Sequence, residues 1–301
     1  MIYLSVEEIA KKWGISDRSV RNYCTEGRIE GAKLENGVWQ IPEDSQKPER
    51  INQKQSEDTL LDILRFENKN GLKGGIYHKV QIELTYNSNH IEGSRLTEEQ
   101  TRYIFETNTV GMMQKFKGVR ADDVVETANH FRCIDYIIDN ATRQVNEHMI
   151  KTLHFILKNG TSESREEWFN VGEYKKMPNE VGGLRTTSPE DVPEAMKNLI
   201  EKYREKENLG LKDLLEFHHD FELIHPFQDG NGRIGRLILF KECLRLNIVP
   251  FVIDEDLKMF YYRGLREWWK EPGYLVETCR AGQDKFLNYL EYFQIKSGEM
   301  G

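Results

Sequence analysis

The sequence has few cysteines and prolines, and it has no long apolar run. Four cysteines in 301 residues lie far apart without metal-like spacing, which predicts reduced thiols and a cytoplasmic protein. No apolar run approaches the roughly 18 residues of a membrane span, and the first residues lack the basic-then-apolar pattern of a signal peptide. The net charge of -8 argues against a nucleic-acid surface over the whole chain. We therefore expect a globular protein with no membrane association.

The prolines are unevenly spaced and suggest where the chain divides. Pro42 and Pro48 flank a short polar segment, and the next proline is Pro178. A long proline-free stretch with helical periodicity is typical of stacked helices. We therefore predict a domain boundary near residue 50. The predicted domains are 1–50 and 51–301, and the larger one is divided into 51–120, 121–245 and 246–301.

The first 50 residues predict two short helices followed by a β-hairpin. Ser5 with Glu8 three residues later forms a capping box at the start of the first helix. Ser16 caps the second helix after a turn at Gly14, and Asn36-Gly37 is a hairpin turn sequence. The order of these elements predicts a small winged helix-turn-helix domain.

This pattern resembles the DNA-binding domain of excisionase and MerR-type regulators, in which the second helix enters the major groove. The resemblance implies DNA contact through Arg18, Arg21 and Asn22, which point outward on the second helix. However, residues 1–50 contain eight Lys and Arg against nine Asp and Glu, so the domain is not basic. A role in docking another protein explains the same pattern, and the sequence leaves both partners open.

Apolar residues recur with a helical period through most of residues 56–301. The predicted helical ranges are 58–66, 76–90, 97–106, 121–139, 146–158, 191–205, 211–224, 233–246, 255–270 and 274–296. The exception is 171–188, where glycines interrupt the apolar residues and predict a β-hairpin that turns within 179–183. The predicted fold class is therefore mainly α, a helical bundle with one small β-hairpin, preceded by the winged helix-turn-helix domain.

The segment His225–Arg236, HPFQDGNGRIGR, concentrates polar groups between two predicted helices. Gly230-Asn231-Gly232 permits positive φ angles, so that successive N–H groups converge on one anion. The following helix, predicted to begin at Arg233, directs its positive N-terminus at the same anion. Arg233 and Arg236 share a helix face, and guanidinium groups match phosphate oxygens. So much positive potential indicates a polyphosphate ligand.

Two further residues of this segment suit chemistry at a phosphate. A lone carboxylate beside phosphates, here Asp229, is a common ligand of Mg²⁺. His225 is the nearby group whose ordinary pKa suits proton transfer near neutral pH. Together they predict in-line attack on a nucleotide phosphorus, in which catalysis is mainly positioning and charge stabilisation.

The segment resembles the HPFx(D/E)GNGRxxR signature of Fic-domain proteins, and every fixed position matches. Fic domains are α-helical bundles that transfer AMP from ATP to a hydroxyl of a target protein and release pyrophosphate. The resemblance implies that His225 deprotonates a Ser, Thr or Tyr hydroxyl of the target, Asp229 binds Mg²⁺ and Arg236 holds the γ-phosphate. It assigns the α- and β-phosphates to Gly230, Asn231, Gly232 and Arg233. Residues 121–245 are then the catalytic core, with Phe227 as the anchor of the loop.

A second segment, Ser88–Gly93, matches the (S/T)xxxE(G/N) inhibitory motif of Fic proteins. Its place ahead of the loop resembles the class in which an inhibitory helix precedes the core. The resemblance implies that Glu92 pairs with Arg236 and so removes the partner of the γ-phosphate. It also implies that Ser88 fixes the end of the inhibitory helix and that Gly93 terminates it.

The predicted hairpin lies where Fic proteins carry a flap that binds the target backbone by strand addition. By this resemblance Val181, Gly182 and Gly183 contact the target protein. The resemblance covers roughly residues 57–245, and the remaining C-terminal part is only generically helical.

Four other interpretations fit parts of the sequence. Gly230-x-Gly232-x-x-Gly235 also fits a dinucleotide fingerprint, but a predicted helix precedes it where that fold requires a strand. His218, His219 and Asp220 near His225 suggest a transition-metal hydrolase, but His218 and His225 are two helical turns apart. The protein could also be a DNA-binding regulator with a nucleotide-sensing domain, or it could remove AMP with the help of Glu92. The sequence leaves open the target, the nucleotide and the oligomeric state, a homodimer included.

Overall fold

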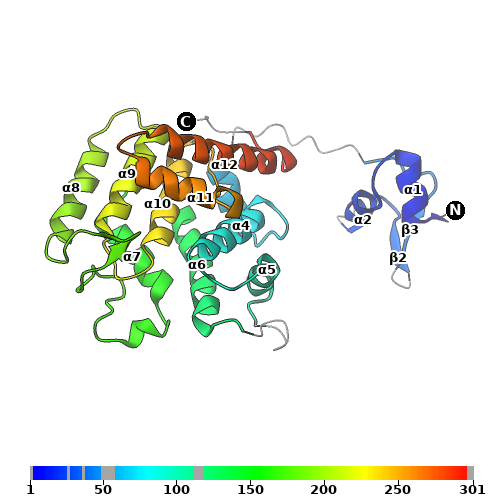
Figure 1. The fold of residues 1–301 in the computed structure, drawn as a ribbon. Helices are drawn as coiled ribbons and strands as arrows, with labels where there is room; N and C mark the ends of the chain where they lie inside the picture. The colour runs from blue at the N-terminus through cyan, green and yellow to red at the C-terminus, as the bar shows by residue number, and fades with distance from the viewer. Residues whose placement is uncertain (1–2, 26–27, 36–37, 49–57, 111–117, 297–301) are drawn as a thin grey trace. The chain divides into compact units, whose positions relative to one another are not determined.

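The computed structural model describes residues 3–25, 28–35, 38–48, 58–110 and 118–296 (Figure 1). The chain divides into two compact units, Met1–Gln55 and Ser56–Gly301. The predicted boundary near residue 50 falls outside the described residues, and the two domains stay a prediction in that respect. Within the described residues, no helix is both long and apolar enough to cross a membrane.

The first unit contains two short helices and a small antiparallel sheet. The helices are α1 (Val6–Trp13) and α2 (Asp17–Thr25), and the strands are β1 (Tyr3–Leu4), β2 (Lys33–Glu35) and β3 (Val38–Pro42), in the order β1-β3-β2. The predicted capping box of Ser5 and Glu8 is present, and Gly14 ends α1 with a φ of 65°. Ile9, Val20 and Ile41 are fully buried between these elements. Strand β1 was not anticipated, because two residues carry no periodic signal.

No observation in this unit tests DNA contact. Arg21 and Asn22 are exposed on α2, and Arg21 lies 3.7 Å from Asp17. The side chain of Arg18 and the turn Asn36-Gly37 lie outside what the structure describes. The helix-turn-helix assignment and its DNA readers therefore stay predictions.

The second unit is a helical bundle. Its α-helices in the described residues are α3 (Leu60–Lys69), α4 (Ile76–Ile91), α5 (Glu98–Thr107), α6 (Ala121–Asn140), α7 (Glu147–Lys158), α8 (Val192–Arg204), α9 (Leu211–Ile224), α10 (Asn231–Leu246), α11 (Glu255–Glu267) and α12 (Gly273–Tyr292). Each corresponds to one predicted helical range. The mainly α fold class is confirmed.

Helix α10 lies at the centre of this bundle. It packs against α3, α4, α6, α7 and α9, and Figure 1 shows the yellow α9 and α10 between the green α8 and the helices α4 and α6. The surrounding core includes Leu153 of α7, Phe221 of α9 and Ile234 of α10, each fully buried. Because its flanking helices bury it on most sides, the start of α10 is held in a rigid frame.

The predicted hairpin is present as β4 (Glu180–Val181) and β5 (Leu184–Arg185). The strands pair antiparallel, with Val181 opposite Leu184. Gly182 and Gly183 connect them with φ angles of 56° and 78°. Two consecutive positive φ angles are the requirement of a type I′ turn, which explains why both residues are glycine.

Candidate active site

The loop between α9 and α10 contains two residues in the left-handed region. His225 ends α9 with a φ of 51°, and Gly230 begins α10 with a φ of 84°. A left-handed histidine is an uncommon conformation that costs some backbone energy, and such residues concentrate at functional sites. The turn at His225 takes the chain out of α9 before Pro226, which cannot continue the helix.

Side chains inside the loop hold it in one conformation. The Asn231 amide accepts from the N–H of Phe227 and donates to the Phe227 carbonyl, both at 2.8 Å. The Phe227 ring is fully buried and stacks on His154 with ring centroids 4.0 Å apart. Gly172 N–H donates to Nδ1 of His154 at 2.9 Å, so Nε2 carries the proton and donates to the Asp229 carbonyl at 3.2 Å. These contacts preorganise the loop.

Two expectations about the loop backbone were wrong. The helix begins at Asn231 and not at Arg233, and Gly232 lies in its first turn instead of adopting a positive φ. Gly232 is glycine for a different reason. A Cβ at this position would overlap Oε1 of Glu92 and would lie 3.0 Å from Nη1 of Arg236. The missing side chain thus lets the Glu92 carboxylate lie directly against the first turn of α10.

His225 is mostly buried beside another titratable group. Its Nδ1 lies 3.3 Å from the Glu222 carbonyl and 3.9 Å from Oε2 of the Glu222 carboxyl. Burial lowers the pKa of His225, and the nearby Lys175 lowers it further. Burial also raises the pKa of Glu222 to about 8. The positive charge of nearby Arg236 lowers this pKa, but it offsets the effect of burial only in part. At neutral pH the imidazole is therefore uncharged and able to accept a proton.

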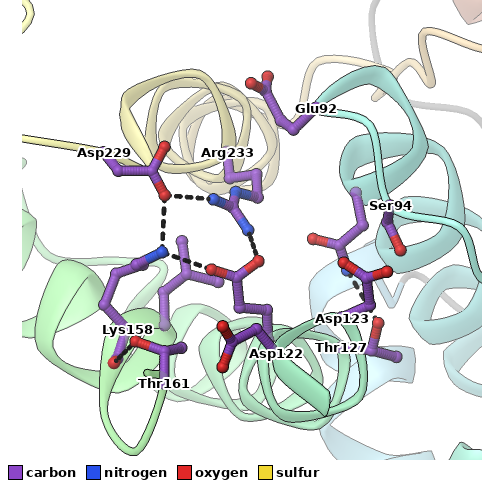
Figure 2. Close-up of polar contacts among 12 residues, drawn as sticks. Glu92, Ser94, Asp122, Asp123, Thr127, Lys158, Thr161, Asp229 and Arg233 are labelled. Carbon is purple, nitrogen blue, oxygen red and sulfur yellow. Dashed lines mark hydrogen bonds and ion pairs between the residues drawn. The ribbon is translucent and has the colours of Figure 1, made fainter. Parts of the chain in front are cut away.

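Asp229 and Arg233 belong to a closed ring of opposite charges, shown in part in Figure 2. Oδ2 of Asp229 accepts from Lys158 at 2.6 Å and from Arg233 at 3.0 Å. Glu126 of α6 binds both cations, with its Oε1 2.5 Å from Lys158 and its Oε2 on Arg233. We call Asp229, Lys158, Glu126 and Arg233 the charge ring. Burial alone would raise the pKa of Asp229, but Arg233 and Lys158 outweigh it and keep the carboxyl ionised.

Arg236 is bound from across the bundle by residues at the end of α4. Its Nη2 donates to Oε1 of Glu92 at 2.7 Å, and its Nε donates to the Ser88 hydroxyl at 3.0 Å. The Ser88 hydroxyl thus contacts Arg236 directly, whereas we expected it at the helix end. Gly93 follows with a φ of 89°, which turns the chain away after α4. In this conformation the Glu92 carboxylate occupies the guanidinium that a phosphate would need.

The hairpin is tied to the same loop through its base. Lys175 N–H donates to the Pro226 carbonyl at 2.9 Å, and its ammonium donates to Asn179 at 2.7 Å. The Asn179 amide in turn donates to the Phe227 carbonyl at 2.9 Å. These bonds fix the base of the hairpin, while Val181, Gly182 and Gly183 at its tip are exposed.

Two of the alternative interpretations lose support. The glycines at 230, 232 and 235 follow helix α9 and no strand, which excludes the dinucleotide fold. In the described ranges, no group of three or more His, Cys, Asp and Glu side chains is arranged to hold a metal ion. His218 is instead a buried histidine whose Nε2 lies 2.5 Å from the Tyr261 hydroxyl.

Comparison with known proteins identifies the family of this part of the chain. Residues 144–242 match the model of the Fic/DOC family. The chain contains a Fic domain. This Fic domain and its surroundings are 27% identical over 189 residues to the protein adenylyltransferase fic-1 of Caenorhabditis elegans, covering 60% of this chain and 35% of the relative. A protein adenylyltransferase Fic of Drosophila yakuba is 25% identical over 222 residues, covering 70% and 42%.

Solved structures share the fold of the Fic domain. A Fic domain containing signaling protein from Bacteroides thetaiotaomicron has a TM-score of 0.57 and 27% identity, covering 77% of this chain and 90% of that one. Fic-1 of C. elegans has a TM-score of 0.60 at 18% identity, covering 78% and 71%. The match spans only 35% of the length of the C. elegans adenylyltransferase, so it does not by itself assign the activity or the targets of that protein to this chain.

The sequence-based interpretation missed three residues in and around this site. Glu126, Lys158 and Glu222 appeared only as polar members of predicted helices. Lys158 is 2% exposed although it ends an amphipathic helix, and a lysine is almost never buried without a partner. Its three carboxylate partners come from other segments, so no spacing in the sequence identifies them.

Proposed function

We propose that this protein transfers AMP from ATP to a Ser, Thr or Tyr hydroxyl of a protein, with Mg²⁺, and that Glu92 restrains the reaction. The observation that carries the proposal is the set of groups gathered at the loop between α9 and α10. This loop brings an uncharged histidine, an ionised aspartate and the N-terminus of α10 together beside Arg236. The names of the curated relatives support the same chemistry.

The residues of the chain suggest how the transfer proceeds. The N–H groups at the start of α10 and the helix dipole hold the phosphates. His225 takes the proton of the target hydroxyl at Nε2, because its Nδ1 faces the Glu222 carbonyl. The hydroxyl oxygen forms a bond to the α-phosphorus while the bond to the β-phosphate oxygen breaks, and pyrophosphate leaves. The exposed edge of the hairpin would bind the target backbone as an added strand.

Asp229 fits the role of a Mg²⁺ ligand. Its carboxylate is ionised and 46% exposed, and both cations of the charge ring contact the same oxygen, Oδ2. A single carboxylate suits Mg²⁺ that is held mainly by phosphates and water. A bound ion would neutralise phosphate charge, while the residues described above orient the reactants.

Labelled nucleotides test the reaction class. The chain carrying Glu92→Gly is incubated with Mg²⁺, a cell lysate and each of the four nucleoside triphosphates labelled at the α-phosphorus. We expect stable label on protein from ATP, and none from ATP labelled at the γ-phosphorus, because pyrophosphate leaves. Transfer of the γ-label would indicate a kinase, and absence of transfer from every nucleotide would contradict the proposal.

The lowered pKa of His225 predicts an unusual pH dependence. Because the imidazole must be uncharged, the transfer rate should stay level as pH falls through about 6.5 and decline only below it. Lys175→Met removes a charge that disfavours the imidazolium, so the decline should move to higher pH. The neighbouring exposed Lys176→Met is the control and should leave the profile unchanged. A decline at the ordinary histidine value in the unmodified loop would contradict this assignment.

A further inference from the structure

The charge ring is more than a chance set of ion pairs, because it closes on itself. Its contacts run from Asp229 to Lys158, on to Glu126 and Arg233, and back to Asp229. Figure 2 shows Lys158 and Arg233 reaching the same oxygen of Asp229 from two sides. Three segments meet here, since Glu126 comes from α6, Lys158 from α7 and the other two from the loop and α10.

The ring restricts the orientation of the first turn of α10 and of the Asp229 carboxylate, which both face the proposed nucleotide site. Arg233 donates from Nη1 to Glu126 and from Nη2 to Asp229, so the plane of its guanidinium is fixed and the first turn of α10 is anchored to α6. Because Oδ2 of Asp229 is held by two cations, the direction of its other oxygen is fixed as well. Lys158 and Arg233 are 2% and 5% exposed and paired within the ring, so neither side chain is available to a ligand directly. The predicted phosphate contact of the Arg233 guanidinium is therefore wrong, and only the backbone N–H of Arg233 stays a candidate for that contact.

We propose that Lys158 and Glu126 are positioning residues, which through the charge ring align Asp229 and the first turn of α10 for a Mg²⁺–nucleoside triphosphate. This inference rests on the proposed function. It assigns no proton or phosphate contact to either residue. Their effect is on the alignment of the groups that make those contacts.

Charge and position predict opposite effects at Glu126. Glu126→Gln removes a negative charge near the phosphate site, so electrostatics alone predicts tighter binding of an anionic nucleotide. If Glu126 anchors Arg233, the same change misaligns α10 and weakens binding. Glu163 is the matched control, because it also contacts Lys158, at 2.9 Å, yet lies outside the ring and is 42% exposed. Glu163→Gln makes the same charge change without opening the ring.

The experiment measures binding without turnover. Isothermal titration of Mg²⁺·ATP is carried out on the full chain carrying Glu92→Gly and His225→Asn, and on the same chain with Glu126→Gln, Glu163→Gln or Lys158→Met. We expect Glu126→Gln to weaken binding roughly tenfold, as for a coupled neighbour, and Glu163→Gln to leave it unchanged or slightly tighter. The titration is repeated without Mg²⁺, and the ratio of the two affinities gives the gain that Mg²⁺ provides. We expect Lys158→Met to reduce this gain, because Asp229 loses its alignment. If the lost positive charge of Lys158 acted only through electrostatics, the more negative site would attract Mg²⁺ more strongly and the gain would increase.

The outcomes separate this inference from the function on which it rests. A parent chain that binds no Mg²⁺·ATP would overturn the proposed function and this inference with it. A parent that binds, with Glu126→Gln binding equally or more tightly, would overturn the positioning role alone. Circular dichroism checks that each variant is folded. If Glu126→Gln does not fold, Glu126→Asp keeps the charge and shortens the side chain, so weaker binding supports positioning and unchanged binding overturns it.

Discussion

Replacing Glu92 by glycine should raise AMP transfer by about 5- to 150-fold, the usual range for a coupling between two sites. The physical reason is the contact of Glu92 with Arg236 at 2.7 Å and its position against Gly232. Without the carboxylate, the guanidinium keeps its contacts with Ser88 but loses its anionic partner, so a phosphate can take that place, and the space beside the first turn of α10 opens. The measurement is the initial rate at which the α-label is incorporated into protein, at the same concentration of Mg²⁺·ATP for both chains.

Two control variants separate inhibition by the Glu92 carboxylate from a general effect of glycine at a helix end. Glu92→Gln keeps the length of the side chain and removes its charge, so it should release most of the restraint. Glu291→Gly changes an exposed acid in the last turn of α12 and should have no effect. Equal transfer rates for the original chain and for Glu92→Gly would show that Glu92 does not inhibit the reaction. If the original chain instead strips AMP from modified protein and Glu92→Gly cannot, Glu92 serves the reverse reaction.

Replacing His225 by alanine should abolish transfer, with a loss of about 10²- to 10⁴-fold, the usual contribution of a general base. The expected loss follows from the lowered pKa of His225, which leaves its imidazole uncharged at neutral pH. The measurement is α-label incorporation in the Glu92→Gly background, together with titration of Mg²⁺·ATP. Binding of the nucleotide should persist, because the phosphate-binding N–H groups belong to α10.

The backbone of His225 requires a second variant. With a φ of 51°, this position disfavours alanine, so His225→Ala also strains the loop. Asparagine tolerates the left-handed region, and His225→Asn should therefore lose transfer equally without that strain. The exposed His148→Ala is the control for loss of an imidazole elsewhere. Substantial transfer by His225→Asn would show that another group accepts the proton.

Much of the fold was predictable because its signals are local. The helices of the second unit follow apolar periodicity, and α1 begins at the capping box of Ser5 with Glu8. Likewise, the paired glycines at 182 and 183 predicted the hairpin turn. Each of these signals depends on residues that are close together in the chain, so no tertiary information is needed to interpret them.

The candidate site was predictable only where it is contiguous. The segment His225–Arg236 contains the proposed base, the proposed Mg²⁺ ligand and the start of α10, and its residue pattern is enough to indicate phosphate chemistry. The pairing of Glu92 with Arg236 was implied by family resemblance alone, since 144 positions separate the two residues. The backbone of Gly232 was predicted wrongly, because a glycine in sequence does not tell whether it serves a turn or a close approach.

The sequence by itself determined the helices, the hairpin and the chemical groups of the loop, because backbone propensities and side-chain chemistry are properties of neighbouring residues. Only the tertiary structure decided which distant charges meet those groups. Glu126 and Lys158 reach Asp229 and Arg233 because α6 and α7 pack beside α10, and the raised pKa of Glu222 depends on its burial. Ion pairing and desolvation are set by three-dimensional distance and by exclusion of water, and neither leaves a periodic trace along the chain.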